Sequence, residues 1–288
     1  MNQLKLFINL TRLKKPIGYM LLFWPCAWGL TLAYDFSSNL NNYFIYLILF
    51  FLGAVLMRSA GCIVNDILDK EFDKKVFRTK NRPIASGQIS IKVAFLYAII
   101  LCLLALFVLL NFNQFTIILA LGSMPLAFTY PLMKRFTYWP QLFLGITFNY
   151  GLVLGWTAIK GEIDIIPIIF YLGAIFWTLG YDTIYGYQDI KDDEIIGLKS
   201  TSIKFKGNEK NFLIICFALL LVLFLVGGHF MKFNNIYYFL TIIPFLHLFL
   251  YQIRIFKSHD PQSCLKIFKS NNIFGLIIFL NILIIKNI

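Results

Sequence analysis

Charged residues are scarce in this sequence. Of its 288 residues, 59% are hydrophobic and 14% are charged, whereas an ordinary soluble domain has about 45–50% apolar and about 25% charged residues. Together with a mean hydropathy of +0.74, this composition excludes a soluble globular enzyme and a disordered or fibrous chain. Apolar runs of about 20 residues, without the alternating ten-residue strands of membrane β-barrels, predict an all-α polytopic protein in a lipid bilayer.

Histidine and cysteine are also few. The three histidines are scattered over the C-terminal third, and the five cysteines are odd in number and unpaired in spacing. We interpret the histidines as structural or solvated residues and the cysteines as small apolar residues. This pattern excludes a disulfide framework and a zinc site.

Nine apolar runs are long enough to span a bilayer, or nearly so. They cover 17–34, 43–65, 91–110, 114–130, 140–159, 164–182, 211–231, 236–256 and 271–287. We expect no cleavable signal in front of the first run. We also expect no linker or extramembrane domain, so that residues 1–288 form a single membrane-embedded domain.

Lysine and arginine are distributed unevenly between the predicted loops. Of the 26 basic residues, 22 precede the first span or follow the second, fourth, sixth and eighth spans. The other side has Lys160, Lys232 and Lys286, and Arg58 lies inside a span. The positive-inside rule then places the N-terminus and the basic loops in the cytoplasm, at a cell inner (cytoplasmic) membrane, and favours nine spans over eight or ten. The net charge of +12 is therefore a topology signal, and we predict no nucleic-acid partner.

Ten of the 14 acidic residues lie in two loops, after the second and sixth spans. Helical spacing predicts one stripe in each region: Asn65, Asp69 and Asp73 in the first, and Asp182, Asp189 and Asp193 in the second. Like charges on one helix face repel each other unless a cation lies between them. Mg²⁺ prefers oxygen ligands and is usually held by one or two carboxylates plus substrate phosphates. We therefore predict Mg²⁺ at the two stripes, with the off-stripe acids Glu71, Asp192 and Glu194 facing water.

Basic and phenolic side chains accompany the stripes. Arg78 and Arg82 are four residues apart directly after the first stripe, and guanidinium groups suit phosphate oxygens. Tyr130 and Lys134 can meet at i, i+4 at the end of the fourth run. Arg58 lies inside the second span, where a charge is costly and indicates a functional site. The substrate that these groups indicate is a lipid with a diphosphate head.

The same motifs resemble those of the UbiA-type intramembrane prenyltransferases. The first motif is Asn65-Asp66-x-x-Asp69-x-x-x-Asp73, followed by Arg78 and Asn81-Arg82-Pro83. The second is Tyr181-Asp182-x-x-Tyr185-x-x-x-Asp189-x-x-x-Asp193, followed by Gly197-x-Lys199-Ser200-Thr201. A third is Tyr130-Pro131-x-x-Lys134. The segment from Arg12 to Pro25 resembles the branch of the family that uses 4-hydroxybenzoate as its acceptor.

The resemblance implies a fold, a reaction and residue roles. The fold is a nine-helix bundle around a central cavity that opens toward the lipid. The reaction transfers a polyprenyl group from polyprenyl diphosphate to the ring carbon ortho to the hydroxyl of 4-hydroxybenzoate, with Mg²⁺ assisting ionisation, as in ubiquinone biosynthesis. The implied metal ligands are Asn65, Asp69, Asp73, Asp189 and Asp193. The implied catalytic residues are Asp69, Asp73, Asp189, Asp193, Tyr130 and Lys134. The implied substrate-binding residues are Arg58, Asn65, Asp66, Arg78, Arg82, Asp182, Tyr185 and Lys199.

Several alternatives stay open from the sequence. Within the same family the acceptor could be homogentisate, a naphthoate or a haem precursor. A transporter could use intramembrane charges, but its charges should spread through the midplane, and here they gather at one end. A CDP-alcohol phosphotransferase should carry an Asp-Gly-x-x-Ala-Arg signature, which is absent. Arg58 could bind either the benzoate carboxylate or the diphosphate.

Overall fold

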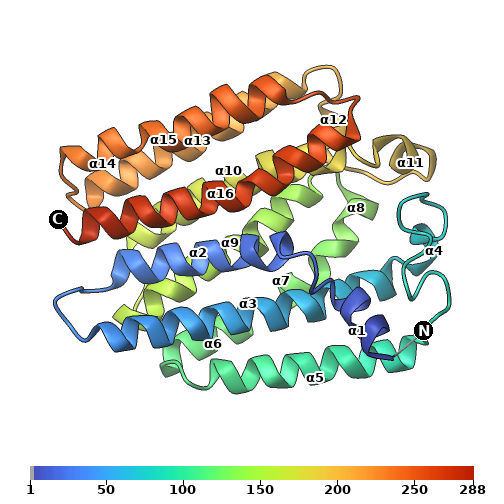
Figure 1. Ribbon diagram of the computed structural model, residues 1–288, viewed down its shortest axis with the longest axis horizontal. Coiled ribbons are helices and arrows are strands. Elements are labelled where there is room, and N and C mark those ends of the chain that lie inside the picture. The colour runs from blue at the N-terminus through green and yellow to red at the C-terminus, as the bar shows by residue number, and fades with distance from the viewer. Residues whose placement is uncertain (1–2) are drawn as a thin grey trace.

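The computed structural model describes residues 3–288, and these form a bundle of long helices without a strand (Figure 1). Seven long helices are continuous: α2 (Ile17–Ala33), α3 (Leu40–Leu68), α5 (Ile91–Leu109), α9 (Pro140–Lys160), α10 (Ile165–Gly186), α13 (Glu209–Phe230) and α16 (Pro261–Lys286). The span Gln114–Phe136 is segmented into α6 (Gln114–Gly122), α7 (Met124–Thr129), η1 (Tyr130–Leu132) and α8 (Met133–Phe136). The span Asn235–Ile253 is segmented into α14 (Asn235–Leu240), α15 (Ile242–Phe245) and the π-helical η2 (Leu246–Ile253).

The predicted number of membrane helices is confirmed approximately. Within residues 3–288, eight helical segments are long and apolar enough to cross a membrane, and α2 is a shorter apolar helix of 17 residues. The fourth run was predicted to end at residue 130, but the helical path continues to Phe136. Pro125 and Pro131 lie at its internal breaks, where their missing backbone N–H groups interrupt the helical hydrogen bonds.

Four short helices gather at the end of the bundle that lies opposite the C-terminus (Figure 1). They are α1 (Gln3–Thr11), α4 (Lys70–Asp73), α11 (Ile190–Ile195) and α12 (Thr201–Lys204). Because α4 follows α3 and α11 follows α10, both acidic regions lie at this one end. The fold therefore brings together loops that are more than 100 residues apart in the chain, such as those of Arg78 and Asp189.

Glycines allow α2 to pack against α9 with very little separation. A Cβ on Gly29 would lie 1.9 Å from the carbonyl oxygen of Leu152, and one on Gly155 would lie 2.3 Å from that of Cys26. Small residues at such contacts are typical of membrane helices, because close packing replaces the hydrophobic effect as the source of attraction. This contact fixes the position of α2, whose first turn borders the site described below.

The two acidic stripes differ in their local structure. At the first, the Asp69 N–H donates to the Asn65 carbonyl (2.9 Å) and the Asp73 N–H to the Asp69 carbonyl (2.8 Å), so the helical spacing persists through a kink at Asp69. The single stripe expected from Asp182 to Asp193 is interrupted, because α10 ends at Gly186 and a turn precedes α11. A seven-residue spacing predicts a common face only where the helix is continuous.

Candidate active site

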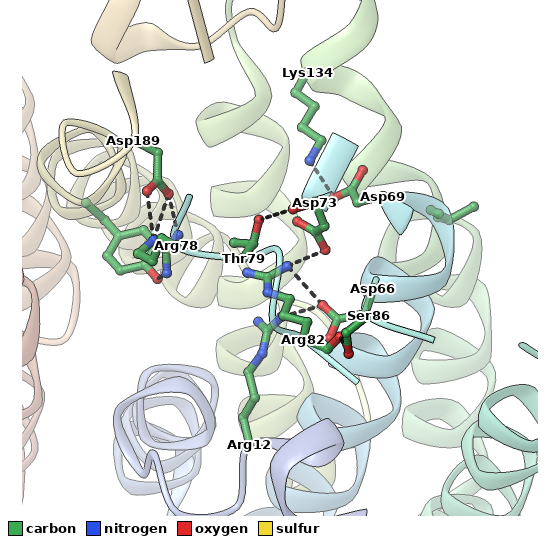
Figure 2. Close-up of polar contacts among 12 residues, drawn as sticks. Arg12, Asp66, Asp69, Asp73, Arg78, Thr79, Arg82, Ser86, Lys134 and Asp189 are labelled. Carbon is green, nitrogen blue, oxygen red and sulfur yellow. Dashed lines mark hydrogen bonds and ion pairs between the residues drawn. The ribbon is translucent and has the colours of Figure 1, made fainter. Parts of the chain in front are cut away.

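Acidic and basic side chains from several segments meet at the end of the bundle where the short helices gather (Figure 2). They come from the turn after α1, the end of α3, α4 and the loop behind it, α8, and the turn before α11. The residues labelled there include Arg12, Asp66, Asp69, Asp73, Arg78, Arg82, Lys134 and Asp189. The structure therefore brings together most of the predicted site residues.

Asp66 and Asp73 share one arginine. Asp66 is 2% exposed, and its Oδ1 accepts from Arg12 Nη2 (2.5 Å) and from Arg82 Nη1 (3.0 Å). Arg82 Nη1 also donates to Asp73 Oδ2 (2.8 Å), and the Asp73 carbonyl accepts from the hydroxyl of Thr79 (3.0 Å). A buried carboxylate needs such charged partners, because its desolvation is costly. Arg82, which we predicted to bind phosphate, thus also holds α3, α4 and the following loop together.

Asp69 lies between two cations and retains a free acceptor. Its side chain is 2% exposed and pairs with Lys134 of α8, while Arg135 Nη2 lies 3.7 Å from Asp69 Oδ1. That Oδ1 accepts no hydrogen bond from any described residue. Most buried carboxylate oxygens are hydrogen-bonded, and an exception is typical of a catalytic group or of a site for a water or an ion.

The second acidic region is tied to the loop after α4. Arg78 Nε donates to Asp189 Oδ1 (2.7 Å), and Arg78 Nη1 donates to the hydroxyl of Tyr185 (3.2 Å). The backbone N–H of Phe77 donates to Asp192 Oδ2 (3.2 Å). Burial, and next the neighbouring Asp189 carboxylate, raise the pKa of Asp193 to about 6. Two carboxylates in close proximity repel each other in this way unless a cation separates them.

Arg58 lies deeper in the bundle than the ion pairs. It precedes Asn65 on α3 by seven residues, which at a rise of 1.5 Å per residue is about 10 Å. Its Cζ is 5.3 Å from the ring centroid of Phe148 of α9, and it interacts electrostatically with Tyr130 and Asp182. Its Nε has no hydrogen-bond partner within the described chain. Arg58, Tyr130 and Asp182 are only partly buried, so the helices are not fully packed around them.

Lys199 is the predicted site residue that the structure sets apart from the carboxylates. Its backbone N–H donates to the carbonyl of Lys134 (2.8 Å), and its Nζ donates to the carbonyl of Phe136 (3.2 Å). The ammonium group also lies 5.6 Å from the ring centroid of Tyr138. Lys199 therefore joins the loop after α11 to α8, and its backbone hydrogen bond holds the backbone of Lys134 in place.

The off-stripe acids lie mostly where helical phase predicts them. Glu71 pairs with Lys74 (2.8 Å) and Glu194 with Lys206 (2.7 Å), both on the surface. Asp192 differs from the prediction, because it is half-buried and accepts from a backbone N–H. It holds the loop after α4 in place.

Two arginines were missed as site residues. We counted Arg12 and Arg135 as topology signals, and Arg12 also as the start of the segment that resembles the family branch, but gave neither a site role, yet they contact Asp66 and Asp69. The position of Arg135 directly after Lys134 was a usable signal. Spacing gave none for the contact of Arg12, which lies in a turn between α1 and α2 with φ of 57°.

The donor set fits a hard divalent cation. In residues 3–288, no three His, Cys, Asp or Glu side chains are grouped so that they hold a metal ion by themselves. Mg²⁺ does not need such a group, because it is commonly held by one or two carboxylates together with phosphates and waters. The free Oδ1 of Asp69 is a suitable ligand atom. The metal-binding roles of Asn65, Asp69, Asp73, Asp189 and Asp193 stay predictions.

Curated relatives cover almost the whole chain. It is 46% identical over 280 residues to the human protein named 4-hydroxybenzoate polyprenyltransferase, mitochondrial, with 96% of this chain and 74% of the human protein covered. It is 43% identical over 276 residues to the protein of the same name from Arabidopsis thaliana, with coverages of 95% and 67%. These values establish common descent.

The same comparison corrects one prediction. A cell inner (cytoplasmic) membrane, with the basic loops in the cytoplasm, is wrong by this comparison, because the human, rat, Arabidopsis and Caenorhabditis elegans relatives are all mitochondrial by name. The distribution of lysine and arginine indicates which loops share one side of a membrane. It carries no information about which membrane that is.

Solved structures share the fold. A UbiA homolog from Aeropyrum pernix K1 has a TM-score of 0.77 at 24% identity, covering 93% of this chain and 98% of that one. A UbiA homolog from Archaeoglobus fulgidus, described as bound to GPP and Mg²⁺, has a TM-score of 0.72 at 18% identity, covering 98% and 100%. The model of the UbiA prenyltransferase family matches residues 22–282. With the family model, the relatives and the fold in agreement, the chain belongs to the UbiA prenyltransferase family.

Proposed function

We propose that the protein transfers a polyprenyl group from polyprenyl diphosphate to 4-hydroxybenzoate, at the ring carbon ortho to the hydroxyl, and releases diphosphate. The observation that carries the proposal is the identity of 40–46% with relatives named for this activity. The relatives compared above are not named for homogentisate, naphthoate or haem-precursor acceptors. A transporter is less well supported, because most of the buried charges are paired at one end of the bundle.

The diphosphate head would bind among the ion pairs. Arg78, Arg82 and Lys134 each contact a carboxylate of the two acidic regions, so each is positioned at the place where phosphate oxygens and carboxylates would meet. Mg²⁺ bound there would neutralise the charge that develops on the leaving diphosphate. The three basic side chains stabilise the same charge through hydrogen bonds to phosphate oxygens. Tyr185 fixes the direction of Arg78 through its hydroxyl.

The aromatic acceptor would bind at Arg58, deeper in the bundle than the diphosphate. Within residues 3–288 this arginine has no partner for its Nε and forms no ion pair, although Asp182 acts on it electrostatically, and it lies against the ring of Phe148. The basic groups above it are paired with carboxylates. A guanidinium group binds a carboxylate through a planar pair of hydrogen bonds. Of the two roles that the sequence left open for Arg58, the benzoate carboxylate is therefore the better supported. The ring of the acceptor would then lie between Arg58 and the diphosphate.

The proposed reaction breaks the allylic C–O bond, and the diphosphate leaves with the electron pair. The ring carbon ortho to the hydroxyl forms the new C–C bond and then loses its proton. Because water would capture the allylic cation, the site must exclude it. Phe148 and Tyr130, whose ring centroids lie 6.3 Å apart edge to face, supply apolar surface at this level of the bundle.

Turnover of radiolabelled 4-hydroxybenzoate by membranes that contain the protein tests the proposal. A series of prenyl diphosphates is supplied with Mg²⁺, and membranes without the protein serve as the blank. We expect label in the lipid fraction and a loss of that label in chelator. Transfer to homogentisate or a naphthoate without transfer to 4-hydroxybenzoate would show that the acceptor is wrong. Absence of transfer to all acceptors would overturn the proposal as a whole.

A further inference from the structure

The first turn of α2 lies against the side chain of Arg58. A Cβ built on Gly18 would be 2.8 Å from Arg58 Nε and 3.5 Å from Arg58 Nη2. Real Cβ atoms essentially never lie within 3.0 Å of such a neighbour. Any larger residue at position 18 must therefore displace the guanidinium group or push α2 away from α3.

The other sides of the guanidinium group are bounded as well. Phe148 lies below it at 5.3 Å, and Tyr130 lies beside it. Gly29 lies on nearly the same face of α2, about three turns further on, in backbone contact with Leu152 of α9. On another face, Trp24 and Trp28 of α2 donate to α16 (2.9 and 3.0 Å), so α2 has little freedom to move away. The position of the Arg58 guanidinium group therefore depends on the absence of a side chain at Gly18.

We propose that Gly18 is a positioning residue for Arg58. Its missing side chain lets the guanidinium group rest against α2, in the place from which it binds the carboxylate of the aromatic acceptor. This inference rests on the proposed function, and Gly18 itself touches no substrate. Because two parallel hydrogen bonds require aligned planes, and misplacement by about 1 Å can cost up to about 10²-fold in rate, the effect of a methyl group at position 18 should be measurable.

Steady-state kinetics of Gly18→Ala in membranes tests the proposal. We expect KM for 4-hydroxybenzoate to rise about 10-fold, within the range of losses for a charged hydrogen bond, and KM for the prenyl diphosphate to stay within about 2-fold. A general disturbance of the site would move both values. The matched control is Gly53→Ala on the same helix as Arg58, because a Cβ at Gly53 meets nothing within 4 Å. An unchanged acceptor KM, or an equal rise for both substrates, would overturn the proposal.

A double-mutant cycle provides a second readout that does not depend on the acceptor. Within a helix alanine is favoured over glycine, and the group that a Cβ at position 18 displaces is the flexible end of the Arg58 side chain. Gly18→Ala should therefore change the midpoint of thermal unfolding of the detergent-solubilised protein less favourably in the wild-type background than in an Arg58→Ala background, where the displaced atoms are gone. Equal changes in the two backgrounds would overturn the contact that we infer, and a more favourable change in the Arg58→Ala background would support it. If wild-type membranes do not prenylate 4-hydroxybenzoate, the proposed function fails, while this cycle still decides whether Gly18 makes room for Arg58.

Discussion

Replacement of Asp69 by asparagine tests whether this carboxylate belongs to the active site or behaves like an ordinary surface acid. The side chain is 2% exposed and keeps one oxygen without a hydrogen-bond partner in the described chain. Asparagine has nearly the same size but removes the charge that attracts a divalent cation. Only two residues further along the chain, Glu71 has a side chain that is 73% exposed and pairs with Lys74. Glu71→Gln makes the same chemical change outside the helical stripe, so it is the matched control.

The two substitutions should differ by about 10²-fold in kcat. Removal of one electrostatic stabiliser from a preorganised site typically costs about 10²–10³ in kcat, and a 10²-fold loss corresponds to about 2.7 kcal/mol at 1.36 kcal/mol per tenfold change. The interaction strengthens as the diphosphate gains charge, so kcat should fall as well as the affinity for the prenyl diphosphate. At Glu71 the charge is screened by solvent, and the rate should stay within a few-fold of the wild type.

Initial rates in membranes, normalised to expression by immunoblot, measure this difference. Asp69→Asn also leaves Lys134 without its carboxylate partner, so thermal unfolding in detergent is needed beside the rates. A low rate with an unchanged unfolding midpoint supports a catalytic role. If Glu71→Gln loses as much activity as Asp69→Asn, helical phase does not select the ligands, and the assignment of both acidic regions is refuted.

Three further outcomes are expected. Mg²⁺ with inorganic diphosphate should raise the unfolding midpoint of the wild type, and chelator should remove this effect; no shift at millimolar concentrations would contradict the metal role. The pKa of Asp193 is raised to about 6, so its carboxyl takes up a proton as pH falls through that value, and the shift that Mg²⁺ gives without diphosphate should weaken below about pH 6. Diphosphate is left out of this measurement because phosphate groups themselves take up protons in this range. Asp193→Asn should abolish the pH step, whereas an ordinary aspartate, with a pKa of about 3.9, would give no step there. Gly155→Ala should destabilise the fold by about 1–3 kcal/mol, because its Cβ would lie 2.3 Å from the Cys26 carbonyl oxygen. Thermal unfolding measures this loss, and Gly122→Ala is the control, because a Cβ there meets nothing within 4 Å. Equal unfolding midpoints for the two variants would show that α2 and α9 can separate at little cost.

The sequence predicts the membrane helices and the first acidic stripe because both depend on local properties. A run of apolar residues must be helical in lipid, where every backbone polar group needs an internal partner. The spacing of Asn65, Asp69 and Asp73 survives in the structure because each N–H still reaches the carbonyl four residues earlier. The second stripe fails at Gly186, where α10 ends. Nothing in the spacing of acidic residues reveals that a turn lies between them.

The ion pairs could not be predicted from the sequence in the same way. Arg12 and Asp66 are 54 residues apart, and Lys134 and Asp69 are 65 apart. Their contacts depend on how α1, α3 and α8 pack, which spacing along one helix does not determine. Loop charge also misled us about the compartment, because an excess of lysine and arginine marks one side of a membrane and does not name the membrane.

The ion pairs have a consequence for the reading of any substitution at this site. Arg82 and Lys134, which we expect to bind phosphate, form ion pairs with Asp66, Asp73 and Asp69. Removing one member of a buried pair leaves the other charge uncompensated, at a typical cost of about 3–5 kcal/mol. A loss of activity in such a variant therefore combines a loss of folded protein with a loss of catalysis. Only variants measured for both the rate and the unfolding midpoint can separate the two. Among the described residues Arg58 forms no ion pair and its Nε has no partner, so at this basic residue the catalytic part should be the larger one.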